Sequence, residues 1–161
     1  MSKKMLCWPL FGVGFDNLGS NHQPCTWDVP EPADDQLLVR IDAIGLCFSD
    51  VKLIRAGEDH PRVYSKDLNN DPVIPGHEAV MTVVQAGDKV AAQYPEGSRY
   101  IIQADIYVNG ENWAYGYAIN GGMAALDRAE TQPMPWPRSA VWRAGRRAYP
   151  SHFLQEFVGL W

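Results

Sequence analysis

The chain has 161 residues, of which 46% are hydrophobic and 20% charged, a composition typical of a globular protein with a buried core and not of a disordered chain. Its net charge of −5 offers no basic footprint, so we expect no nucleic-acid partner. No stretch reaches the ~18–20 consecutive apolar residues of a membrane span, so we also expect no membrane insertion.

The three cysteines stand at positions 7, 25 and 47, and this odd number at wide spacing indicates no disulfide framework. A reducing, cytoplasmic location is the expectation that follows. Residues 5–15 form an apolar run after two lysines, as in a secretion signal. Pro9, Gly12 and Gly14 interrupt the run and no small-residue cleavage site follows, so we interpret it as part of the folded domain.

Hydrophobic alternation and turn residues predict several short strands. The expected strands cover residues 5–15 (one or two strands), 37–44, 79–84 and 100–108. The clearest is 37–44, in which Val39, Ile41 and Ala43 share one face. Residues 79–84 are apolar nearly throughout, which indicates burial on both faces.

One short helix is expected over residues 49–56, with Ser49 or Asp50 as its N-terminal cap and Gly57 at its end. Residues 58–72 are polar and are expected to form an exposed excursion. Turn signals at residues 109–110 and 120–122 separate the later strands. Short strands divided by turns, with few helices, predict a mainly β fold, either a barrel or a sandwich.

Cys47, His77 and Glu78 are residue types that hold zinc in catalytic sites, where three protein ligands leave one position open. Their spacing alone is weak, because a lone cysteine is commonly a buried hydrophobe and a loop histidine commonly has no ligand role. His77 and Glu78 are adjacent and would point to opposite faces of a strand. Both can reach one metal only if the backbone turns at Pro75-Gly76.

The two segments that contain these residues resemble those of a known enzyme family. Gly45-Leu46-Cys47-Phe48-Ser49-Asp50 and Pro75-Gly76-His77-Glu78 resemble the catalytic domain of zinc-dependent medium-chain alcohol and polyol dehydrogenases. The similarity is greatest to the branch that includes sorbitol dehydrogenase and sorbose-1-phosphate reductase. It implies a GroES-like β-barrel and a polyol or sugar-phosphate substrate. It also implies zinc held by Cys47 and His77, with Glu78 either a direct ligand or just behind the metal.

By the same resemblance, Ser49 would relay the proton of the substrate hydroxyl and Asp50 would steady a metal ligand. Both residues can equally be helix caps, and the two roles are compatible. Some relatives extend the proton relay through a histidine two residues after the aspartate. Lys52 occupies that position here.

The chain also departs from the family pattern. It has no cysteine beyond Cys47, so the four-cysteine structural zinc lobe of many relatives is not expected. It has no Gly-x-Gly-x-x-Gly and no βαβ pattern, so we expect no Rossmann domain, with NAD or NADP bound only in a complete enzyme. The prediction is a truncated catalytic-domain portion, inactive alone. The alternative is a non-catalytic GroES-like module that binds zinc or a partner.

Residues 1–123 are expected to form the catalytic domain, and residues 124–161 an atypical tail. The tail has five arginines and no lysine, and in the resembling enzymes a barrel strand follows this point. Our hypothesis is that the tail is not homologous to the family, as after a frameshift or truncation. Apolar barrel surface left uncovered would then favour self-association into homo-oligomers.

Five further side chains, two histidines and three aromatic residues, have simpler interpretations. His22 and His60 lie in polar loops and are expected at the surface. Trp113 and Tyr117 belong to an aromatic cluster, with Tyr115 between them. Burial in the core is the favoured role for this cluster, with a place in the wall of a substrate pocket as the alternative.

Overall fold

The computed structural model describes residues 3–105, 107–108, 110–124, 132–134 and 155–156. Ile106, Asn109 and most of the predicted tail lie outside the described residues, so the domain boundary at residue 123 stays a prediction. No helix among the described residues has the length and apolar character needed to cross a membrane.

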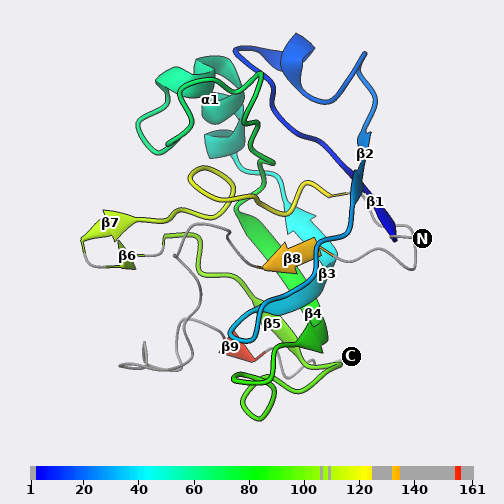
Figure 1. Cartoon of the computed structure of the whole chain (residues 1–161). Coiled ribbons are helices and arrows are strands. Elements are labelled where there is room, and N and C mark those ends of the chain that lie inside the picture. The colour runs from blue at the N-terminus through cyan, green and yellow to red at the C-terminus, as the bar shows by residue number, and fades with distance from the viewer. Residues whose placement is uncertain (1–2, 106, 109, 125–131, 135–154, 157–161) are drawn as a thin grey trace.

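The described part is mainly β, as the alternating pattern predicted. Its largest sheet has five antiparallel strands in the order β8-β3-β4-β5-β9 (Figure 1). These strands are β3 (Leu37–Gly45), β4 (Glu78–Ala86), β5 (Arg99–Ile101), β8 (Gln132–Met134) and β9 (Gln155–Glu156). Two smaller antiparallel pairs join β1 (Lys4–Cys7) to β2 (Cys25–Asp28) and β6 (Tyr107–Val108) to β7 (Glu111–Asn112).

The long pair β3–β4 forms because both segments carry the apolar residues that a two-sided core needs. Val39 and Ile41 of β3 and Met81 and Val83 of β4 are almost completely buried in one cluster, which also holds Tyr115. The pairing runs from Leu37 opposite Ala86 to Gly45 opposite Glu78. The end of β3 is therefore fixed beside the start of β4.

On the outer face of this sheet, Asp42 collects three polar partners. Thr82 Oγ1 donates to it at 2.5 Å, and the side chains of Arg40 and Arg99 donate at 2.8 and 3.2 Å. Burial alone would raise the pKa of Asp42, but these hydrogen bonds and the two positive charges outweigh it and lower the pKa. The carboxylate thus ties β3, β4 and β5 together on their polar side.

The predicted helix is present as α1 (Phe48–Ala56), but its cap differs from the expectation. Cys47 is the N-cap, and Asp50 occupies the third helical position, where its Oδ2 accepts the Cys47 backbone N–H at 3.0 Å. This is the reciprocal half of a capping box, which a carboxylate at that position can supply as well as glutamate does. Gly57 ends the helix with φ +58 and begins the short 3-10 helix η2 (Gly57–Asp59).

Two further expectations need correction. Residues 58–72 are not simply an exposed excursion, because Val63 and Leu68 are buried in a second core beside Leu53 of α1. Of the one or two strands expected in the run 5–15, one is present as β1, and Phe15 starts the short helix η1 (Phe15–Asn17). The second correction concerns the run 100–108.

The run 100–108 is not one continuous strand. β5 ends at Ile101, and β6 begins only at Tyr107. The reason lies in the partner strand, because Ile102 N–H donates to Ala79, next to the first residue of β4. Beyond that point only Glu78 of β4 remains. The Ala104 carbonyl instead accepts the Tyr115 N–H at 3.0 Å.

Candidate metal centre

Cys47, His77 and Glu78 come together at the joined ends of β3 and β4. Cys47 stands two residues after the end of β3 and just before α1, and His77 immediately precedes β4, whose first residue is Glu78. One ligand atom from each of the three residues lies within 4.8 Å of those of the other two. Cys47 is thirty residues from His77 in sequence, and the antiparallel pairing of β3 with β4 is what brings it to the adjacent pair His77 and Glu78.

Two glycines allow the adjacent residues His77 and Glu78 to face the same site. Gly76 has φ +96, which turns the chain just before His77, so that His77 precedes the strand and does not follow its alternation. Gly45 faces Glu78 across the ladder, and a Cβ there would lie only 2.3 Å from Glu78 Oε2. The missing side chain at Gly45 leaves room for the carboxylate. Glu78 Oε1 lies 3.8 Å from His77 Nε2.

Asp50 fixes the orientation of the histidine from behind. It is buried, and its Oδ1 accepts the His77 Nδ1–H at 3.0 Å and the Gly76 backbone N–H at 3.2 Å. Nε2 is then the ring atom that faces Glu78. A carboxylate on the far nitrogen is the usual companion of a metal-binding histidine, since it sets the tautomer and the ring orientation.

The donor set and its separation fit zinc. Sulfur, imidazole nitrogen and carboxylate oxygen are the atoms that zinc takes in catalytic sites. A tetrahedral ion with bonds of about 2.0–2.3 Å holds its ligand atoms about 3.3–3.8 Å apart. The three atoms here need only a small approach, which the exposed Glu78 side chain is free to make. Among the described residues, no second group of this kind was found.

Ser49 links the cluster to an aromatic side chain. Its Oγ lies 3.5 Å from Cys47 Sγ, and its side chain lies close enough to the Tyr117 hydroxyl to affect the pKa of that group. The Tyr117 ring is buried with its centroid 5.5 Å from that of His77. Burial raises the pKa of Tyr117, and the nearby Asp50 charge adds to this rise, so the hydroxyl stays protonated near neutral pH. Tyr117 is thus both a core residue and a neighbour of the cluster.

The segment that carries Tyr117 is anchored beneath His77. Gly121, Gly122 and Met123 donate backbone N–H groups to Ile74, Gly76 and Pro75, at 2.6, 2.7 and 2.9 Å. The sequence indicated only a turn at residues 120–122. A long-range pairing of this kind leaves no signal in local composition, so the position of Tyr117 beside the cluster could not be predicted.

The two loop histidines behave differently. His22 is exposed as expected. His60 is not a free surface residue, because its ring packs on Tyr117 with centroids 5.0 Å apart. Burial, and next the charge of Arg62, lower the pKa of His60, so its ring is neutral near pH 7. Lys52 extends over the exposed Phe48 ring at 5.5 Å.

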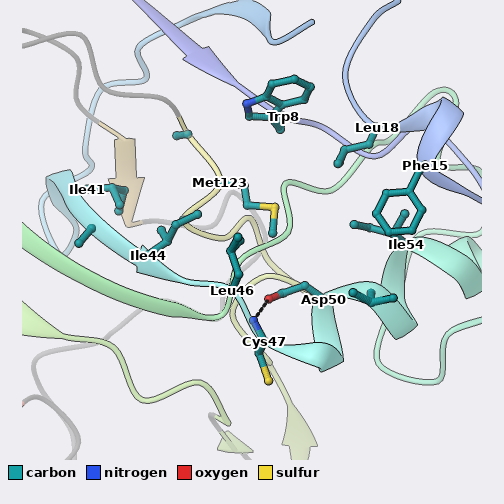
Figure 2. A pocket seen from close by; sticks show the side chains of 14 residues that line it. Trp8, Phe15, Leu18, Ile41, Ile44, Leu46, Cys47, Asp50, Ile54 and Met123 are labelled. Atoms are coloured by element: carbon teal, nitrogen blue, oxygen red, sulfur yellow. Dashed lines mark hydrogen bonds between the residues drawn. The ribbon is translucent and has the colours of Figure 1, made fainter. Parts of the chain in front are cut away.

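On the other side of the Cys47 backbone lies an apolar pocket of about 540 Å³. Figure 2 shows Cys47 Sγ pointing away from the labelled side chains of Trp8, Phe15 and Met123, while Asp50 contacts the Cys47 backbone nitrogen. Leu46 also lines the pocket and is 80% exposed. Sequence reasoning missed this pocket, because its walls come from four separate parts of the chain.

Comparison with known proteins agrees with this arrangement. Residues 33–134 match the alcohol dehydrogenase GroES-like domain family. Sorbitol dehydrogenase from Bombyx mori is 44% identical over 64 residues, which cover 40% of this chain and 17% of that protein. L-sorbose 1-phosphate reductase from Klebsiella pneumoniae is 32% identical over 94 residues, covering 58% of this chain and 23% of that protein. The chain therefore corresponds to less than a quarter of these relatives.

The fold likeness extends further than the sequence likeness. A thermostable alcohol dehydrogenase from Pyrobaculum aerophilum superposes with a TM-score of 0.63 over 83% of this chain and 39% of that one, at 21% identity. At 21% identity, this similarity supports a shared fold and nothing more. The matched family segment spans β3, α1, β4 and the three clustered donor residues. The mainly β fold is the expected GroES-like one, and the chain belongs to the alcohol dehydrogenase GroES-like domain family.

Proposed function

We propose that this domain binds one zinc ion through Cys47 Sγ, His77 Nε2 and a carboxylate oxygen of Glu78. We propose further that it is the catalytic-domain portion of an NAD(P)-dependent dehydrogenase that acts on polyols or sugar phosphates. The observation that carries the proposal is the convergence of the three donor atoms within 4.8 Å, with Asp50 bonded to the far side of His77. The names of the polyol and sugar-phosphate relatives supply the substrate class.

A bound zinc ion acts as a Lewis acid that makes an alcohol hydroxyl more acidic. The chain's own residues would prepare that step. Asp50 holds the His77 ring so that Nε2 faces the cluster, and Ser49 Oγ, 3.5 Å from Cys47 Sγ, would relay the substrate proton, accepting it while its own hydroxyl proton passes to solvent. Glu78 is exposed, so the cluster opens to solvent and a substrate can approach it.

The oxidised carbon would pass its hydride to NAD or NADP. The 161-residue sequence contains no Gly-x-Gly-x-x-Gly fingerprint to hold such a cofactor. We therefore expect the purified 161-residue chain to bind zinc without oxidising an alcohol. Alcohol-dependent formation of NADH or NADPH by this chain would contradict that expectation.

Metal analysis of the purified chain tests the zinc site. We expect about one zinc per chain in the wild type and almost none in Cys47→Ala, because the thiolate is the softest of the three donors. Cys25→Ala is the matched control, since Cys25 is half-buried and lies outside the donor group, and it should keep its zinc. A folded wild type without zinc, or a Cys47→Ala variant that retains it, would refute the site.

A second candidate is a non-catalytic module that binds a partner. It is favoured by Leu46 and Phe48, which are 80% and 65% exposed and flank Cys47 next to the apolar pocket. The same metal analysis separates the two candidates. A well-folded, metal-free wild type points to the binding module.

A further inference from the structure

Arg62 lies close to the proposed zinc site, although it is not a candidate ligand. Its guanidinium carbon is 5.7 Å from the centre of the Tyr117 ring, and the same ring centre is 5.5 Å from that of His77. The Arg62 charge is therefore no farther from His77 than the sum of these two distances. An extended phosphorylated sugar alcohol can span that separation, with a carbinol carbon near His77 and its phosphate near Arg62.

The guanidinium is held in place and remains accessible. Arg62 Nη1 donates to Asp105 at 2.6 Å, and about two-fifths of the Arg62 side chain is exposed. A guanidinium carries five N–H donors in a planar fork, so one bond to Asp105 leaves it able to serve a second acceptor. Arginine held in this way is suited to phosphate, because its fork matches two phosphate oxygens.

A second donor stands beside it. His60 Nδ1 accepts the backbone N–H of Arg62 at 3.3 Å, which places the proton of the neutral ring on Nε2. The His60 ring packs on Tyr117, whose hydroxyl lies near Ser49. Ser49, Tyr117 and His60 therefore place hydroxyl and imidazole groups between the donor cluster and Arg62, as the binding of a polyhydroxylated compound requires.

The charged groups lie at opposite ends of this series of contacts. The candidate ligands Cys47 and Glu78, with Asp50 behind them, supply groups that favour a cation. Arg62 supplies the positive group on the other side of Tyr117. We propose that Arg62 binds the phosphate of a phosphorylated sugar alcohol whose reacting hydroxyl lies at Cys47, His77 and Glu78. This inference rests on the proposed function and narrows its substrate class from polyols or sugar phosphates to sugar-alcohol phosphates.

A purely structural role for Arg62 makes a different prediction. If Arg62 only ties its loop to Asp105, then Asp105→Asn should weaken the fold as much as Arg62→Gln does, and neither change should affect ligand choice. If Arg62 binds phosphate, Asp105→Asn removes the competing negative charge and should preserve or strengthen the preference for a phosphorylated ligand. The two variants therefore separate the roles.

The test is calorimetric titration of the zinc-loaded chain with sorbitol 6-phosphate, sorbitol and inorganic phosphate. We expect sorbitol 6-phosphate to bind about ten- to a hundredfold more tightly than sorbitol, as for one charge-assisted contact. Inorganic phosphate should bind weakly, because it lacks the hydroxyl chain. Arg62→Gln should abolish the preference while zinc content and sorbitol affinity stay unchanged. Arg62→Lys, which keeps the charge but not the fork, should retain part of it.

Arg55→Gln is the matched control, since Arg55 is an exposed arginine on α1, and it should leave the preference intact. Equal affinity for sorbitol and sorbitol 6-phosphate, binding of neither compound, or a preference that survives Arg62→Gln would overturn the inference. Zinc content is measured separately on the same samples. A chain that holds zinc but shows no phosphate preference refutes the role of Arg62 and leaves the proposed function standing.

Discussion

On one side of the turn between β3 and α1 lie the donor atoms of Cys47, His77 and Glu78, and on the other lies the apolar pocket beneath Leu46. The first side is ordered by hydrogen bonds, chiefly the three that Asp50 accepts from Cys47, Gly76 and His77. The second side and the cores around it are ordered by packing. The contrast suggests that metal affinity and fold stability can be changed separately.

The largest expected effect is on the hydrogen-bonded side. His77→Ala removes the nitrogen donor and should reduce bound zinc from about one ion per chain to almost none, because the remaining donors cannot complete the site. Elemental analysis measures this loss. The exposed His22 provides the control variant His22→Ala, which should keep its zinc. Zinc retained at full stoichiometry in His77→Ala would show that the cluster is not the site.

Leu53→Ala tests the packed side. Leu53 of α1 is completely buried against the loop that carries Val63 and Leu68, so we expect a loss of about 2–5 kcal/mol in the free energy of unfolding. Urea denaturation measures it, and the exposed Lys52→Ala should change stability by less than about 0.5 kcal/mol. Below the unfolding transition, zinc content should be unchanged. Zinc loss from folded Leu53→Ala would mean that the two sides are coupled.

Asp50→Asn should affect both properties moderately, because Asp50 orients His77 and also closes the capping box of α1. We expect zinc affinity to fall about 10- to 100-fold, as for loss of a carboxylate behind a metal-binding histidine. The free energy of unfolding should fall by about 1 kcal/mol. Chelator competition and urea denaturation measure the two effects. Asp59→Asn, an exposed change in η2, is the control, and an equal effect there would argue against a special role for Asp50.

Gly45→Ala sharpens the comparison further, since it adds one methyl group directly opposite Glu78. The new Cβ would lie 2.3 Å from Glu78 Oε2, so the carboxylate must move away from the cluster. We expect zinc affinity to fall about tenfold or less, with little change in stability. The double variant Gly45→Ala/Glu78→Gln should bind zinc no more weakly than Glu78→Gln alone. Additive losses would show that Gly45 acts on something other than Glu78.

The smallest expected effect is on the pH dependence of the free energy of unfolding, through Asp42 on the polar face of the sheet. Asp42 has a pKa below its usual value in the folded chain, so its contribution to stability is present above the unfolded value of 3.8 and is lost as pH falls through the folded value. Asp42→Asn should therefore flatten the acid limb of stability against pH. Asp35→Asn is the control, since Asp35 has no hydrogen-bond or ion-pair partner among the residues that the structure describes. An unchanged acid limb in Asp42→Asn would contradict the assignment.

Much of the fold could be predicted from local patterns. The strand at residues 37–44 and the helix at 49–56 were expected at nearly the observed positions, because alternation and a glycine stop are local signals. The expectation of one continuous strand over 100–108 was wrong. Alternation is a local signal, and it could not show that pairing with β4 stops after Ile101. The burial of Val63 and Leu68 was missed for a similar reason, because only contact with α1 buries them.

The sequence by itself determined which donor atoms this domain offers, since a thiol, an imidazole and a carboxylate are properties of single residues. It also determined the motifs that carry the family resemblance. The tertiary structure alone decided that these donors meet, that Gly45 leaves Glu78 room, and that Tyr117 and Arg62 lie alongside them. The physical reason is that donor chemistry is local, whereas distance depends on the pairing of β3 with β4 and on backbone hydrogen bonds between segments far apart in sequence.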